Sequence, residues 1–256
     1  MNDIIIEVEG GKSVRCKTAN KVCKGDIIVK AKSNDDLYRQ LIEGPISGEF
    51  IIPEGITTLR NYAFAGCKET TKFVLPTTLE TIGEYCFNSS NGLGKQELPE
   101  GLTTIGARAF ASSDLVEVVI PSTLKTVLGN AFASATALET VIIRNGVERL
   151  ESLSFNSCTN LKTVWLPNSL VNHSGGAPFY GCSNVEVITL EQGFSGDNYN
   201  FSQSTKYSVE VLVAMFEALT DLTGQTAKTL TVGATNLAKL SEEQKQIATN
   251  KNWILK

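Results

Sequence analysis

The amino-acid sequence predicts an α/β solenoid, in which one short unit is wound repeatedly around a shared apolar core. Three observations support this prediction. Phenylalanines recur in steps of 22 to 24 residues, prolines recur with nearly the same period, and apolar residues keep their place within each unit. A unit of this size cannot bury its own apolar face, so stacked copies must bury it for one another.

The repeated unit carries one phenylalanine, one proline slot and three apolar positions between them. The phenylalanines are Phe64, Phe87, Phe110, Phe132, Phe155 and Phe179; the prolines are Pro53, Pro76, Pro99, Pro121 and Pro167, and Arg144 stands where a sixth would fall. The apolar columns are Leu93, Leu115, Leu138, Leu161 and Val185; then Phe73, Val118, Val141, Val164 and Ile188; then Leu75, Leu98, Ile120, Ile143, Leu166 and Leu190. We expect each column to run along the core of the solenoid.

The segment before each proline alternates and is rich in valine, isoleucine and leucine, which predicts a short strand of a parallel sheet. Proline then ends the strand because it has no N–H to donate. The rest of each unit, such as residues 102–110, is too short and too rich in threonine and glycine for a long helix, so we expect extended or irregular backbone there. Gln96 and His173 interrupt the apolar columns.

These patterns divide the chain into four regions. Residues 1–33 contain three predicted strands with Gly10-Gly11 as a hairpin turn, and residues 34–47 contain a short amphipathic helix that caps the first coil. Residues 48–196 hold the repeats of about 23 residues. Residues 197–256 form an α/β cap at the C-terminal end.

The C-terminal cap is predicted to contain true helices. Val211, Met215 and Leu219 have helical spacing, and S-E-E-Q from Ser241 is typical of a capping box. In the segments T-L-T-V and W-I-L-K, Leu230 lies 23 residues before Trp253 and Val232 lies 23 before Leu255, which preserves the period of the repeats. We therefore expect these two strands to extend the parallel sheet, with helices in place of the irregular arcs.

The repeats A-F-A-G-C-K-E-T-T-K-F-V-L-P-T-T-L from Ala63 and S-F-N-S-C-T-N-L-K-T-V-W-L-P-N-S-L from Ser154 resemble the BspA-like leucine-rich repeat of bacterial surface and prophage-associated proteins. The resemblance covers roughly residues 48–196 in six copies. It implies a right-handed coil with a parallel sheet on its concave face, a non-enzymatic role in binding proteins or host surfaces, and a location at the cell surface, outside the cell or on a phage particle.

Composition and motifs limit the other classes of function. Lys and Arg number 23 against 27 Asp and Glu, so the chain lacks the basic surface that nucleic acid needs. No apolar run approaches about 20 residues and the start M-N-D-I-I-I lacks leader features, so neither membrane insertion nor a signal peptide is expected. No cofactor is predicted, because G-K-S at Gly11 lacks the first glycine of a phosphate-binding loop.

The histidine and the cysteines are not expected to form a catalytic or metal site. His173 is the single histidine and the repeat places no acid beside it, so a structural role is favoured over an enzyme that pairs it with Cys158 or Cys182. A metal site from these three residues lacks a fourth ligand. Cys67, Cys158 and Cys182 share one column, which favours reduced core thiols, although Cys158 and Cys182 in adjacent coils lie within disulfide reach. Cys16 could pair with Cys23.

Trp165 is the residue that points to a function, because strand alternation turns it away from the core residues on either side of it. The equivalent outward residues are Ile51, Val74, Glu97, Val119, Ile142, Trp165 and Thr189. The neighbouring outward row is Glu49, Lys72, Lys95, Glu117, Thr140, Thr163 and Val187, in which opposite charges meet on adjacent strands. Three explanations stay open: a ligand surface, the preference of β-branched residues for exposed strands, and self-association through the strip.

The favoured hypothesis is a non-catalytic module that presents the concave face to a protein or glycan on a cell surface. The predicted ligand-binding residues are Val74, Lys95, Glu117, Val119, Ile142, Thr163 and Trp165. The alternative is a structural or receptor-binding component of a phage or prophage particle. Oligomeric state and ligand identity stay open.

Overall fold

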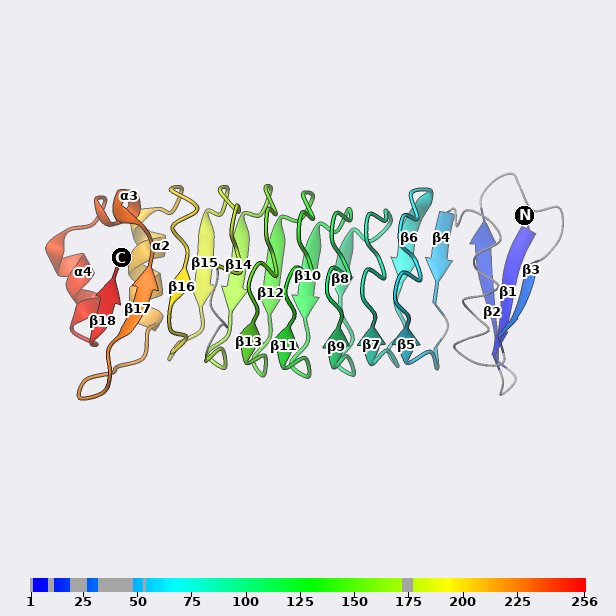
Figure 1. The fold of residues 1–256 in the computed structure, drawn as a ribbon, viewed down its shortest axis with the longest axis horizontal. Helices are drawn as coiled ribbons and strands as arrows, with labels where there is room; N and C mark the ends of the chain where they lie inside the picture. The colour runs from blue at the N-terminus through cyan, green and yellow to red at the C-terminus, as the bar shows by residue number, and fades with distance from the viewer. Residues whose placement is uncertain (1, 9–11, 19–26, 32–47, 53, 172–176) are drawn as a thin grey trace.

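The computed structural model of the 256-residue chain describes residues 2–8, 12–18, 27–31, 48–52, 54–171 and 177–256, the first three ranges as backbone only. The coils follow one another along the long axis of the molecule, from the N-terminal strands to the C-terminal helices (Figure 1). This arrangement confirms the predicted α/β solenoid. Within the described residues, no helix is long and apolar enough to cross a membrane.

The N-terminal sheet has three strands, β1 (Asn2–Val8), β2 (Lys12–Thr18) and β3 (Ile27–Ala31). Strand β1 is central, antiparallel to β2 and parallel to β3. The three strands predicted in this part of the sequence are therefore present. The predicted glycine turn, the helix within residues 34–47, and Cys23 lie outside the described residues.

Every coil has the predicted strand before its proline slot. These strands are β4 (Gly48–Ile51), β6 (Thr70–Val74), β8 (Lys95–Glu97), β10 (Glu117–Ile120), β12 (Thr140–Ile143), β14 (Thr163–Leu166) and β15 (Val187–Leu190). Paired residues lie 22 to 24 positions apart, as the period predicts. The strands form two parallel sheets, β4–β6 and β8-β10-β12-β14-β15, and we call the five-stranded one the main sheet.

The break between the two sheets lies at Gln96. This residue stands in register with Val118 of the next coil, where the other coils have apolar side chains. Its amide nitrogen donates to the backbone oxygens of Phe73, at 3.3 Å, and Leu93, at 2.6 Å. These bonds satisfy the amide of Gln96, so the coil tolerates a polar side chain in line with an apolar column.

A second series of short strands follows the first five of these strands along the chain. They are β5 (Thr58–Leu59), β7 (Thr81–Ile82), β9 (Thr104–Ile105), β11 (Thr126–Val127) and β13 (Arg149–Leu150). The extended backbone expected there is confirmed, but its parallel pairing, as β5-β7-β9 and β11-β13, was not predicted. In each strand the second residue is buried, so the apolar column holds successive coils in register.

The core is built around a ladder of phenylalanine rings. From Phe64 to Phe179, neighbouring ring centroids lie 5.3, 5.4, 5.1, 4.9 and 5.3 Å apart, and no pair is tilted by more than 14°. The predicted stacking is therefore confirmed. Phe201 continues the ladder at 6.3 Å from Phe179, so the coiled core extends into the region assigned to the C-terminal cap.

The C-terminal region contains β16 (Tyr199–Asn200), α2 (Val209–Ala218), β17 (Lys228–Thr231), α3 (Ala234–Leu237), α4 (Glu242–Thr249) and β18 (Trp253–Leu255). The predicted helices are present. Ser208 caps α2 by accepting from the backbone N–H of Val211, and Ser241 with Gln244 forms the predicted capping box of α4.

The prediction that the last two strands extend the main sheet is wrong. Strand β17 pairs with β16 on one side and β18 on the other in a separate parallel sheet, and the partner of Lys228 is Trp253, 25 residues later instead of 23. Helix α2 packs against β15, the last strand of the main sheet. Because the helix stands where the next strand would pair, it ends the sheet and covers the core there.

Candidate binding surface

The candidate surface is centred on a row of apolar side chains across three strands of the main sheet. Val119 on β10, Ile142 on β12 and Trp165 on β14 are direct neighbours in register. We call these three residues the apolar strip. The residues on either side of each one along its strand are buried, whereas Trp165 is 47% exposed. The alternation that turns Trp165 outward is thus as predicted.

The outward row beside the strip contains the other predicted site residues. Thr163 neighbours Thr140 on one side and Val187 on the other. Lys95 forms an ion pair with Glu117 at 2.9 Å, and Lys72 pairs with Glu49 at 2.8 Å, so both charge pairs expected from the sequence are present. These pairs are largely exposed, and each contributes at most about 1 kcal/mol to stability.

Val74 does not join the strip. It lies on β6, in the other sheet, and Glu97 occupies the outward position between it and Val119. Six of the seven predicted residues therefore lie on the main sheet, and Val74 lies beyond its edge.

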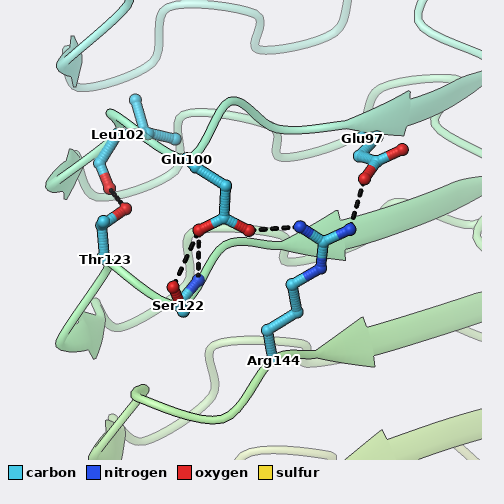
Figure 2. Close-up of polar contacts among 6 residues, drawn as sticks. All are labelled: Glu97, Glu100, Leu102, Ser122, Thr123 and Arg144. Atoms are coloured by element: carbon cyan, nitrogen blue, oxygen red, sulfur yellow. Dashed lines mark hydrogen bonds and ion pairs between the residues drawn. The ribbon is translucent and has the colours of Figure 1, made fainter.

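Arg144 adds a feature that sequence reasoning missed. It follows β12 directly, in the proline slot, and its guanidinium donates to carboxylate oxygens of both Glu97 and Glu100 (Figure 2). Glu97 ends β8, and β10 lies between β8 and β12, so the side chain spans a whole strand. The missing proline was the only signal for it, because its partners are 44 and 47 residues away.

Glu100 is held from two sides. Besides Arg144, it accepts from the backbone N–H and the hydroxyl of Ser122, at 3.1 and 2.8 Å (Figure 2). Desolvation is the largest single influence and acts to raise the pKa of Glu100, but the hydrogen bonds from Arg144 and Ser122 together outweigh it and lower the pKa below its usual value. Glu100 therefore stays ionised at neutral pH and fixes the end of the Arg144 bridge.

A hollow of about 520 Å³ lies at the break between the sheets, lined by residues of β6 and β8. Gly92, Gly94, Lys72, Lys95 and Gln96 are among the residues that line it. Asp114 accepts from the backbone N–H groups of Gly92 and Leu93, at 2.7 and 2.9 Å, which fixes this loop. The hollow is thus separate from the apolar strip, none of whose three residues lines it.

The cysteines of the described coils behave as core residues. Cys158 and Cys182 are buried free thiols in adjacent coils, and they donate to the backbone oxygens of Phe132 and Phe155. The hydrogen bond with Cys182, together with burial, raises the pKa of Cys158, which suppresses its thiolate. His173 lies outside the described residues. Among those described, no three His, Cys, Asp or Glu side chains are grouped to hold a metal ion.

Comparison with known proteins identifies the repeat. A family model described as the BspA type leucine rich repeat region matches residues 46–138 and 127–214, in six copies. The leucine-rich repeat protein of T. pallidum has a similar structure, with a TM-score of 0.53 and 22% sequence identity over 81% of this chain and 85% of that one. No curated protein sequence matches the chain.

Two further solved structures resemble parts of the chain. A leucine-rich repeat protein of Bacteroides ovatus has 22% identity and a TM-score of 0.41, covering 60% of this chain and 52% of that one. The pneumococcal vaccine antigen PcpA has 19% identity and a TM-score of 0.44, covering 59% and 42%. With its repeats matched over more than half of its length and its phenylalanines stacked coil on coil, the chain belongs to the BspA-type leucine-rich repeat family.

Proposed function

We propose that the protein is a non-catalytic binding module whose ligand, a protein or a glycan on a cell surface, lies across the apolar strip. Members of this repeat family are typically non-catalytic, and the fold suits a protein-binding module. The observation that carries the proposal is Trp165, a large aromatic side chain left half exposed on a regular sheet. Tryptophan is among the residues that most often dominate binding energy at interfaces.

The β-sheet preference of branched side chains accounts for only part of the strip. Val119 and Ile142 suit an exposed strand for that reason alone. A tryptophan gains little from facing water, because its exposed apolar area leaves water only when a partner covers it. The parallel pairing on both sides of β14 also holds the backbone of Trp165 in place, so no backbone entropy is lost there on binding.

The test is a binding screen against host matrix proteins and a glycan array, with Trp165→Ala compared against Tyr180→Ala. Tyr180 is also an exposed aromatic residue, at 55%, but it follows Phe179 in the arc between β14 and β15 and lies outside the main sheet. We expect Trp165→Ala to weaken binding at least tenfold and Tyr180→Ala to leave it unchanged. Equal binding by both variants would contradict the proposal.

Self-association is separated by the same variants. Sedimentation of the wild type at rising concentration measures whether the strip pairs with a second copy. If the wild type dimerises and Trp165→Ala is monomeric, the strip is an interface between copies of the chain. That result would contradict the proposal that it binds a cell-surface ligand. The alternative role in a phage or prophage particle stays a prediction, which the gene neighbourhood of the protein would test.

A further inference from the structure

The charges around the apolar strip narrow the chemistry of its ligand, and this inference rests on the function proposed above. We consider the five strands of the main sheet with the residues that directly precede and follow them. Five glutamates lie there, but only three cations, and Glu100 adds a sixth glutamate three residues beyond β8. The five glutamates are Glu97, Glu117, Glu139, Glu186 and Glu191, and the cations are Lys95, Arg144 and Lys162. This surface is therefore acidic, although it contains the apolar strip at its centre.

All three cations already have glutamate partners within the surface. Lys95 pairs with Glu117 at 2.9 Å and Lys162 with Glu139 at 3.2 Å. Arg144 is shared between Glu97 and Glu100, so one positive charge faces two negative ones. The excess of negative charge is thus not neutralised from within.

The remaining acids lie at the far end of the strip. Glu191 accepts from the backbone N–H of Asn168 and the amide of Asn145, both at 3.0 Å, and these neutral donors orient its carboxylate without cancelling its charge. Among the described residues, neither Glu191 nor Glu186 has a cation within ion-pair distance. Negative charge therefore borders the strip at both ends.

Glu97 lies in line with the apolar strip. It occupies the same outward row as Val119, Ile142 and Trp165, and its side chain is 65% exposed. Across three strand spacings the row runs over about 14 Å from an acid, through two aliphatic residues, to an aromatic ring. Arg144 is a positioning residue here, because it holds the Glu97 carboxylate at the end of the row.

We propose that the ligand is a basic polypeptide segment, which places an apolar side chain on the strip and lysine or arginine side chains against the surrounding glutamates. Complementary charge steers such a partner and rejects acidic ones, whereas a neutral glycan gains nothing from the surplus acids. An extended chain advances about 3.3 Å per residue, so about four residues separate the side chain on Trp165 from the cation at Glu97.

A random dodecapeptide display library, selected on the full chain, tests this without assuming a ligand. We expect enriched peptides to carry net positive charge and at least one large apolar residue, and to lose binding on Trp165→Ala. The dissociation constant of a selected peptide should rise about twofold to fivefold for each neutralised glutamate in Glu97→Gln/Glu191→Gln. Binding should also weaken as salt concentration rises.

The matched control is Glu80→Gln/Glu84→Gln, which changes the net charge equally but flanks β7 of the second strand series. We expect it to bind selected peptides as the wild type does. Equal weakening by the control would mean unspecific attraction to an acidic protein and would overturn the inference.

The other outcomes separate the inference from the proposed function. Neutral or acidic peptides that need Trp165 would overturn the basic ligand and leave the binding module standing. If no peptide is enriched and a glycan on the array binds in a Trp165-dependent way, the basic ligand is again overturned and the binding module again stands. Peptides that bind Trp165→Ala as well as the wild type would overturn both, because the strip would not be the site.

Discussion

The inner and outer rows of the solenoid arise from the same repeat but differ in what they hold. Inside, every coil from Phe64 to Phe179 supplies a phenylalanine, and the rings stack at nearly constant spacing. Outside, the row that contains Trp165 changes from coil to coil between isoleucine, valine, glutamate, tryptophan and threonine. One winding thus produces a uniform row and a variable one.

The difference follows from what surrounds each row. An inner side chain is in contact with other side chains on all sides, so a change in its volume leaves a cavity or a clash. An outer side chain faces water, which adapts to any shape. The inner rows therefore determine whether the chain folds, and the outer row is free to encode what it binds.

Removal of one ring should produce the largest effect. Phe110 is fully buried, with its centroid 5.4 Å from that of Phe87 and 5.1 Å from that of Phe132. We expect Phe110→Ala to lower the free energy of unfolding by about 3–5 kcal/mol, measured by denaturant titration. A loss below about 1 kcal/mol would show that the ladder is not the main source of stability.

A smaller effect of opposite sign is expected at Ser154. This residue is fully buried in a column that holds Ala109 and Ala131, and in the described part of the chain its hydroxyl has no hydrogen-bond partner. We expect Ser154→Ala to raise the free energy of unfolding by about 1 kcal/mol, because an unsatisfied polar group is removed. Destabilisation by this variant would mean that the hydroxyl does have a partner.

The bridge from Arg144 to Glu97 and Glu100 should contribute about 1 kcal/mol or less to the free energy of unfolding, since its residues are partly exposed. The pKa of Glu100 is lowered in the folded state, so its contribution is present above the ordinary glutamate pKa of about 4.3 and is lost as pH falls through the lower folded value. The stability difference between wild type and Arg144→Gln should therefore shrink in acid. If the stability difference between the two proteins is unchanged or larger in acid, the ion pair between Arg144 and Glu100 does not stabilise the fold.

The sequence was sufficient to predict the features that recur with the period. A repeat of 22 to 24 residues identifies the stacked phenylalanines, and strand alternation then turns Trp165 outward and places Lys95 beside Glu117. Each of these predictions depends only on counting positions from one coil to the next.

The structural features that the sequence did not predict either break the period of the repeat or are too short for the period to be recognised. Strands of two residues, such as Thr81–Ile82, leave no alternation to recognise. The Arg144 bridge skips a coil, so comparison of adjacent repeats does not reveal it. In the C-terminal region, helix α2 displaces the next strand of the main sheet, and the pairing of β17 with β18 moves from 23 to 25 residues.

The most direct test of the division between the two rows is the unfolding free energy of Trp165→Ala, measured beside Phe110→Ala under the same conditions. If the outer row is free of the folding constraint, Trp165→Ala should change this free energy by no more than about 0.5 kcal/mol. A loss comparable to that of Phe110→Ala would contradict the account, because it would show that Trp165 belongs to the core.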